Sequence, residues 1–386
     1  MPRGIEQTGG RMSEYQYYEF QAIDRPLGEA DREALRALSS RARITATSFT
    51  NHYDWGDFKG DPKKLMESCF DLHLYLANWG ARRLMIRLPQ RLVDPSLLDA
   101  CLSEVDWVEV SAAGENLIVD IRRDEVDLDH FEWDDGSGWL AALAPLRADA
   151  MSGDLRLFYL LWLAAVDEEE VEDGATEPLP GIGPLTGALE AFAGFFYIDP
   201  DLVMAAAEHP KDVGHAAASS DAARRALAAM TEADKTELLL RLVDGDPHVA
   251  AELRGRLRTL YARPATGLRT AGELRARRAA IREARERAAA QRLAAEQARK
   301  KAEAEKARRA RLDILKRRGA AAWQDVEMEI ERRNPAGYET AAGLLSDLGE
   351  LAAEQGTLAE FTRRIEAIRV KHGRKRTFIE RLRGGA

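Results

Sequence analysis

The sequence has little cysteine and no hydrophobic run long enough to span a membrane. Its 386 residues include only two cysteines, Cys69 and Cys101, each inside an apolar stretch, which excludes a disulfide framework and predicts two buried thiols. The first residues lack the apolar core of a signal peptide, and no run reaches the roughly 18 apolar residues of a membrane helix. We therefore predict a cytoplasmic protein in a reducing compartment, with no membrane partner. Two interpretations of residues 1–11 remain open, a disordered lead and a translation start at Met12.

The sequence also lacks the common motifs of catalysis and of cofactor binding. It contains no Walker-type phosphate loop, no nucleophile elbow and no EF-hand loop, and the glycines of PGIGPLTG follow no predicted strand. His52, Asp54 and Asp57 are close in sequence, but their spacing matches no metal motif. We interpret them as a polar strand end and turn, in preference to a metal or acid–base site. No cofactor, metal site or catalytic residue is predicted.

Charge is plentiful but unevenly distributed. Charged residues make up 31% of the chain, with a formal net charge of −9. Between Glu104 and Gly183 acidic residues far outnumber basic ones, whereas between Glu273 and Arg318 the excess is basic. Such segregation predicts attraction between the two segments, within one molecule or between two.

The fold class that these patterns predict is α+β and predominantly helical. Residues 12–130 read as a mixed α/β sandwich, with helices on one face of a mixed sheet. Predicted strands lie at 15–23, 44–53, 83–88, 105–111 and 117–121, and predicted helices lie at 29–40, 62–79 and 95–102. The second of these helices runs from Pro62 through Leu65, Phe70, Leu74 and Trp79 to a glycine cap at Gly80.

Residues 131–262 predict a helical bundle that carries an acidic loop. The loop contains DEEEVED and the helix-breaking PLPGIGP. Short connections between helices of moderate length favour a bundle or an irregular solenoid. The predicted helices are 139–146, 155–166, 185–196, 200–208, 220–230, 232–243 and 247–261.

Residues 273–318 predict one long basic helix. The run contains no proline or glycine and is rich in Ala, Arg, Glu and Lys, all strong helix formers. At a rise of about 1.5 Å per residue it would be roughly 70 Å long. Leu274 and Ile281 begin a heptad pattern that continues only with alanines, while several Glu residues precede a cation by four positions. A solvated single helix and a weak coiled coil both remain open.

Residues 320–386 predict a small helical module that ends the chain. Its pattern AW..VE..I....P..YE.AAGLLSDLGELA resembles a C-terminal helical module of bacterial proteins that carry SWIM-type zinc fingers. The cysteines and histidine of such a finger are absent, so the resemblance implies helical packing and a docking role without metal. The front half resembles bacterial conserved hypothetical proteins.

Two basic clusters, on the long helix and in the tail, are the candidate binding residues. They would contact either phosphates or an acidic partner, and the alternative is a solvated surface. The cations are Arg299, Lys300, Lys301, Arg308, Arg309, Arg311, Lys316, Arg317, Arg318, Lys371, Arg374, Lys375 and Arg376.

The sequence favours a non-enzymatic interaction or scaffold protein with an unidentified protein partner. A nucleic-acid-associated protein is the first alternative, because the basic clusters suit phosphates. The aromatic residues Tyr15, Tyr17, Tyr18 and Phe20 could also stack on bases, but we favour a packed strand, because no basic residue lies among them before Arg25. An enzyme of unrecognised class, using the loop of His52, Asp54 and Asp57, is the second alternative.

Overall fold

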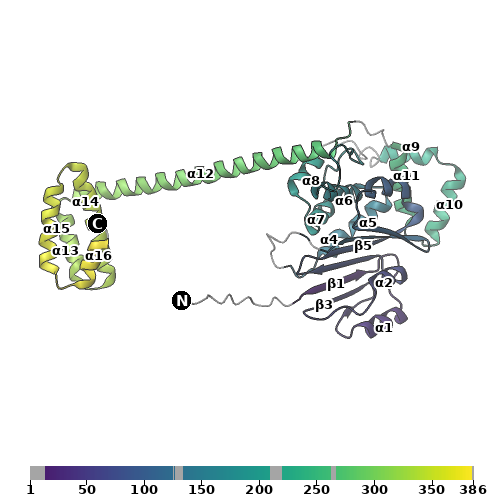
Figure 1. Cartoon of the computed structure of the whole chain (residues 1–386), viewed down its shortest axis with the longest axis horizontal. Helices are drawn as coiled ribbons and strands as arrows, with labels where there is room; N and C mark the ends of the chain where they lie inside the picture. The colour runs from purple at the N-terminus through teal and green to yellow at the C-terminus, as the bar shows by residue number, and fades with distance from the viewer. Residues whose placement is uncertain (1–13, 125, 127–133, 209–219, 262–266, 385–386) are drawn as a thin grey trace, which may run out of the picture. The chain divides into compact units, whose positions relative to one another are not determined.

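The computed structural model describes residues 14–124, 126, 134–208, 220–261 and 267–384 of the chain. These residues fall into two compact units, Met1–Ala284 and Arg285–Ala386, which we call the head unit and the tail unit (Figure 1). The regions predicted at 12–130 and 131–262 both belong to the head unit. The predicted lead at 1–11 lies outside the described residues.

A seven-stranded sheet organises the head unit. Its spatial order is β2-β3-β1-β4-β5-β7-β6, and every neighbouring pair is antiparallel. The prediction of a mixed sheet is therefore wrong. The connections allow each strand to run in the direction opposite to that of its neighbours in the sheet. The strands are β1 Gln16–Gln21, β2 Arg43–Ile44, β3 Ser48–Tyr53, β4 Leu72–Ala77, β5 Arg82–Pro89, β6 Val108–Ala113 and β7 Asn116–Arg123.

Strand β4 replaces most of the helix predicted at 62–79. Helix α2 covers only Pro62–Ser68, and the chain then enters the sheet as Leu72–Ala77. Leu72, Leu74 and Leu76 face one core, while His73 on the alternate face stacks on Phe20 in the other. This period of two is the pattern of a strand buried on both faces. Gly80, predicted as a helix cap, instead has a φ of 104° in the β4–β5 turn.

Helices cover both faces of the sheet, and not one face as predicted. Helices α1 Glu29–Leu38 and α2 close one face, where Leu35 and Met66 contact Phe20 and Phe49 in a compact aromatic core. The opposite face packs against α3 Pro95–Leu102 and the helices that follow the sheet. The head unit is thus a layered α+β fold.

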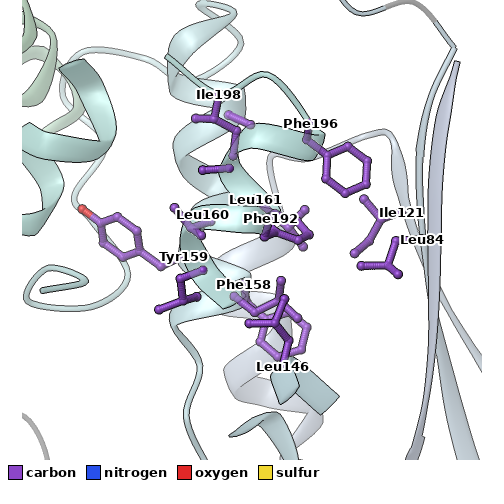
Figure 2. Packing of buried hydrophobic residues seen from close by; sticks show 14 of the residues in the cluster. Leu84, Ile121, Leu146, Phe158, Tyr159, Leu160, Leu161, Phe192, Phe196 and Ile198 are labelled. Carbon is purple, nitrogen blue, oxygen red and sulfur yellow. The ribbon is translucent and has the colours of Figure 1, made fainter. Parts of the chain in front are cut away.

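The larger core joins the sheet to a helical layer. Helix α6 Arg156–Asp167 is its centre, since every residue from Leu157 to Val166 is buried. Figure 2 shows Leu84 and Ile121 pointing from the sheet towards the helices, where Phe158 and Phe196 lie in the same cluster. The other helices of this layer are α4 Trp139–Leu143, α5 Pro145–Met151, α7 Gly187–Phe195, α8 Pro200–Ala207, α9 Ser220–Ala229, α10 Glu232–Val243 and α11 Val249–Tyr261.

Helix α12 Ala271–Arg318 is continuous, as the sequence predicted, and contributes to both units. The tail unit adds α13 Ala320–Glu331, α14 Pro335–Gln355, α15 Leu358–His372 and α16 Arg376–Gly384. Val326, Ile330, Ala341 and Phe378 are fully buried in its core, which confirms the predicted helical packing. None of the helices in the described ranges combines the length and hydropathy that a membrane span requires.

Candidate functional site

The first turns of α12 are fastened to the head unit by a buried ion pair. Just before the helix, the Arg269 guanidinium binds the carboxylate of Glu177 at 2.9 Å. The hydroxyl of Tyr159 donates to the same carboxylate at 2.5 Å, and Glu177 is buried. Leu274 is fully buried beside them. The start of the helix is therefore part of the head core.

Three further arginines on α12 pair with acidic residues of the head unit. Arg278 lies 2.6 Å from Asp167, Arg275 pairs with Asp173, and Arg282 pairs with Asp199. Asp167 and Asp173 belong to the acidic segment recognised in the sequence. Within one molecule, this acidic segment thus forms ion pairs with the first part of the basic run. Attraction within one molecule was one of the two alternatives predicted from the charge pattern.

The middle of α12 is exposed on all sides in the single chain. Every residue from 282 to 307 is exposed, including Leu293 at 58%. Glu296 supports this segment by pairing with Lys300 at 2.7 Å, one helical turn away. The alanines 288, 295 and 302 of the heptad pattern are exposed as well. This segment is the longest part of the described chain that no other element covers.

The end of α12 is fastened to the tail unit in the same way as its start is to the head unit. Leu312 and Leu315 are buried, and the flanking arginines pair with acids of α14. Arg308 lies 2.7 Å from Glu350, Arg309 lies 3.4 Å from Glu354, and Arg311 lies 3.6 Å from Asp347. These three cations, predicted as binding residues, therefore have partners within the tail unit.

Half of the other predicted cations also have acidic partners. The pairs are Arg299–Glu303 at 3.8 Å, Lys300–Glu296 at 2.7 Å, Arg318–Asp325 at 2.7 Å, Lys375–Glu331 at 3.2 Å and Lys371–Glu327. Over the described ranges, Lys301, Lys316, Arg317, Arg374 and Arg376 form no ion pair, and Arg317 donates to the carbonyl of Asp313. Phosphates would thus compete with existing partners at most positions of the two clusters.

A histidine lies among the cations of the tail. His372 is 4% exposed, with Nδ1 3.7 Å from Glu331 and Nε2 3.9 Å from Glu327. Burial lowers the pKa of His372, and the charge of Lys375 lowers it further. The ring is therefore neutral at physiological pH and acts as part of the tail core.

The head unit contains a recess of about 560 Å³ on the sheet face closed by α1 and α2. One cross-strand row of this face reads Tyr18, Tyr75, Arg83 and Arg122 along β1, β4, β5 and β7. Phe58, from the loop before α2, lies 5.1 Å from Tyr18 between ring centroids. Two tyrosines and two arginines thus adjoin on the floor of the recess.

Polar contacts hold the aromatic floor in place. The side-chain oxygen of Gln16 accepts hydrogen bonds from Tyr18 at 2.8 Å and from Tyr75 at 3.2 Å. Its amide nitrogen donates to Asp57 at 3.0 Å. Gly60 lets the loop cross closely, since a Cβ there would lie 2.5 Å from the ring of Phe58. These contacts join the loop before α2 to the floor of the recess.

His73 is a buried wall residue with one unused nitrogen. Its Nδ1 lies 3.0 Å from the carbonyl oxygen of Glu19, whereas Nε2 has no partner within the described structure. Burial and the charge of Arg83 lower its pKa to about 3, so the ring is neutral. With the proton on Nδ1, Nε2 is a free acceptor. The sequence prediction considered this residue beside the loop of His52, Asp54 and Asp57 but placed it in a helix at 62–79, whereas it lies on strand β4.

The loop considered for metal or acid–base chemistry does not form a joint site. His52 stacks on Tyr15, whereas Asp57 accepts from Gln16 on the other face of the sheet. No hydrogen bond or ion pair joins His52 to Asp54 or Asp57 in the described chain. Among the described residues, no group of three histidine, cysteine or carboxylate side chains is placed to hold a metal ion. Both cysteines are buried, and burial raises the pKa of each thiol.

Comparison with protein-family models, curated proteins and solved structures found no match. The resemblance of the tail to SWIM-associated modules therefore stays a prediction.

Proposed function

We propose that the protein is a bridging factor that binds one partner through its head unit and another through its tail unit. The observation that carries the proposal is the continuous helix α12, which is anchored in each unit while residues 282–307 stay exposed. An isolated helix of this kind costs conformational entropy and buries no surface of its own. Its use is to connect two folded bodies, and we propose the cytoplasm as the place where it does so.

The anchoring contacts support this proposal. Leu274 and Ile281 at one end and Leu312 and Leu315 at the other are buried, so each end contributes to a folded core. At the head end, the pair of Arg278 with Asp167 also orients the helix, because it places charge on a defined side. A flexible linker would need none of these contacts.

The tail unit offers a surface for the second partner. A small recess of about 230 Å³ is lined by Trp323, Leu351 and Phe361, with the Arg364 guanidinium 5.1 Å from the centroid of the Trp323 ring. Aromatic side chains and arginine are the residues most enriched at the centre of protein interfaces. The resemblance to docking modules of SWIM proteins agrees with a protein partner here.

A cleavable version of the full chain tests the proposal. A protease site is inserted after Ala290, in the exposed segment, and the chain is tagged at its N-terminus and captured from cells with its partners. Cleavage on the affinity resin should release the tail unit together with one set of partners, while a different set stays with the head unit. A matched chain with a scrambled protease site should release neither.

Two outcomes would contradict bridging. If every captured protein stays on the resin after cleavage, only the head unit binds partners. If every one leaves with the tail, the head unit is not a binding unit under these conditions. The nucleic-acid alternative is checked in the same eluates, because a phosphate-binding tail would release nucleic acid that nuclease removes and salt displaces.

A further inference from the structure

The recess on the sheet of the head unit has the composition of a small-ligand site. Its volume of about 560 Å³ falls within the range of roughly 300–1,000 Å³ that is usual for ligand pockets. Four of its lining side chains carry flat rings, namely Tyr18, Phe58, Tyr75 and Trp79. A planar ring would therefore gain stacking contacts there.

One polar group sets the chemistry of such a ring. The exposed carboxylate of Asp57 uses one oxygen for Gln16 and accepts a further donor with the other. Asp57 thus favours a ligand that presents an N–H or O–H group.

Arg122 provides the site for a negative group. Its guanidinium pairs with Asp124 at 2.9 Å, but the two side chains are 62% and 75% exposed, so solvent weakens this pair. The neighbouring Arg83 is instead held by Asp120, through bonds of 2.8 and 2.6 Å with both carboxylate oxygens. Arg122 is consequently the cation of this face that a ligand phosphate would engage.

We propose that the recess binds a nucleobase that carries a phosphate, stacked on Trp79 and Tyr75, with a base N–H towards Asp57 and the phosphate on Arg122. This inference does not rest on the bridging function, since every residue that carries it lies in the head unit. The same chemistry comes from a free nucleotide or from single-stranded RNA, in which unpaired bases stack on aromatic side chains.

Calorimetric titration of the full chain tests the proposal. The probes are adenosine and guanosine 5′-monophosphate, their nucleosides, and a short oligoadenylate. At least one monophosphate should bind saturably and more tightly than its nucleoside. A monophosphate that binds as tightly as the oligoadenylate identifies the free nucleotide as the source, and tighter, salt-sensitive binding of the oligoadenylate identifies RNA.

Paired variants locate the binding. Trp79→Ala should weaken it about tenfold or more, the usual effect of losing one stacking ring. Trp55→Ala is the matched control, because Trp55 is 74% exposed and stands outside the recess. Arg122→Ala should abolish the preference for the monophosphate over the nucleoside.

Urea unfolding of the variants distinguishes recognition from folding. Trp79 and Arg122 are 44% and 62% exposed, so Trp79→Ala and Arg122→Ala should leave the unfolding midpoint of the head unit nearly unchanged while ligand affinity falls. The proposal is overturned if no monophosphate and no oligoadenylate binds at millimolar concentration. It is equally overturned if Trp55→Ala weakens binding as much as Trp79→Ala does.

Discussion

The head and tail units use charge in opposite ways. In the head unit, Asp71 is fully buried and binds Arg87 at 2.7 Å and Arg147 at 3.3 Å, and Arg147 also binds Asp24 at 2.6 Å. In the tail unit, the side chains of the Arg309–Glu354 pair are 60% and 39% exposed. The first network fixes the positions of β1, β4, β5 and α5, whereas the second only supports a helix contact that apolar residues already make.

The difference shows why a count of charges says little about function. The basic residues that dominate α12 and the tail are mostly surface cations with weak, screened partners. The four charged groups of the head network, Asp24, Asp71, Arg87 and Arg147, come from distant parts of the sequence and are joined by hydrogen bonds. Four predictions follow from this contrast.

Removal of Arg147 should have the largest effect. Arg147→Ala leaves the buried Asp71 and the half-buried Asp24 without their shared cation, which costs about 3–5 kcal/mol of head-unit stability. Urea unfolding followed by hydrogen exchange of head peptides measures the loss, while tail peptides should keep their protection. Arg147→Lys, which keeps the charge but not the paired geometry, should lose a smaller part. A loss below about 1 kcal/mol for Arg147→Ala would show that the head network is no stronger than the tail pairs.

Acid should affect the head unit through Asp24. Burial raises the pKa of Asp24, but the hydrogen bonds from His248 and Arg147 outweigh it and lower the pKa well below its ordinary value. The carboxylate therefore stabilises the fold fully above its unfolded pKa of about 3.9 and loses this contribution as pH falls further. The free energy of unfolding should fall below about pH 4 more steeply in the wild type than in Asp24→Asn. Equal slopes in the two proteins would contradict the assignment.

Salt should have a smaller effect, and it should lower the stability of the tail unit more than that of the head unit. Screening at molar salt reduces interactions between exposed charges far more than those between buried ones. In calorimetric scans with sodium chloride, the transition of the tail unit should therefore fall by a few degrees relative to that of the head unit. Parallel shifts of both transitions would mean that the exposed pairs contribute no more than the buried network does.

The smallest expected effect belongs to a single tail pair. Arg309→Ala should change the stability of the tail unit by less than about 1 kcal/mol, since both side chains of the pair are solvated. Leu315→Ala, in the neighbouring buried position, is the comparison and should cost about 2–5 kcal/mol. Thermal unfolding monitored by tail-unit hydrogen exchange measures both. If Arg309→Ala destabilised the tail unit more than Leu315→Ala, the stability of the tail unit would depend mainly on its ion pairs.

Local patterns predicted most of the fold correctly. Helix α3 begins at Pro95 and ends at Leu102 as expected, because Asp94 caps its first turn and proline starts it. The basic run at 273–318, which has no glycine or proline, predicted α12 from the helix preference of its own residues. The predicted α+β class and the helical tail followed from these elements, each of which carries its own start and stop signals.

The candidate site could not be predicted, and one strand explains why. The spacing of four residues between Phe70 and Leu74 suggested a helix. The segment LHLYLA, residues 72–77, instead alternates with a period of two, which is the pattern of a strand. Because of that choice, the sequence did not predict that His73 and Tyr75 lie on a sheet. Only the sheet register brings them beside Tyr18 and Arg83. Pairing between strands distant in sequence depends on the whole topology, and no single segment encodes it.

The two outer strands of the sheet bear on how the protein behaves at high concentration. At one edge β2 has two residues and begins with Arg43, and at the other β6 carries Glu109, which pairs with Lys63 of α2 at 2.6 Å. Short or charged edges are poor templates for the addition of a foreign strand. A sheet of seven strands thus ends at both sides in features that oppose fibre growth and aggregation.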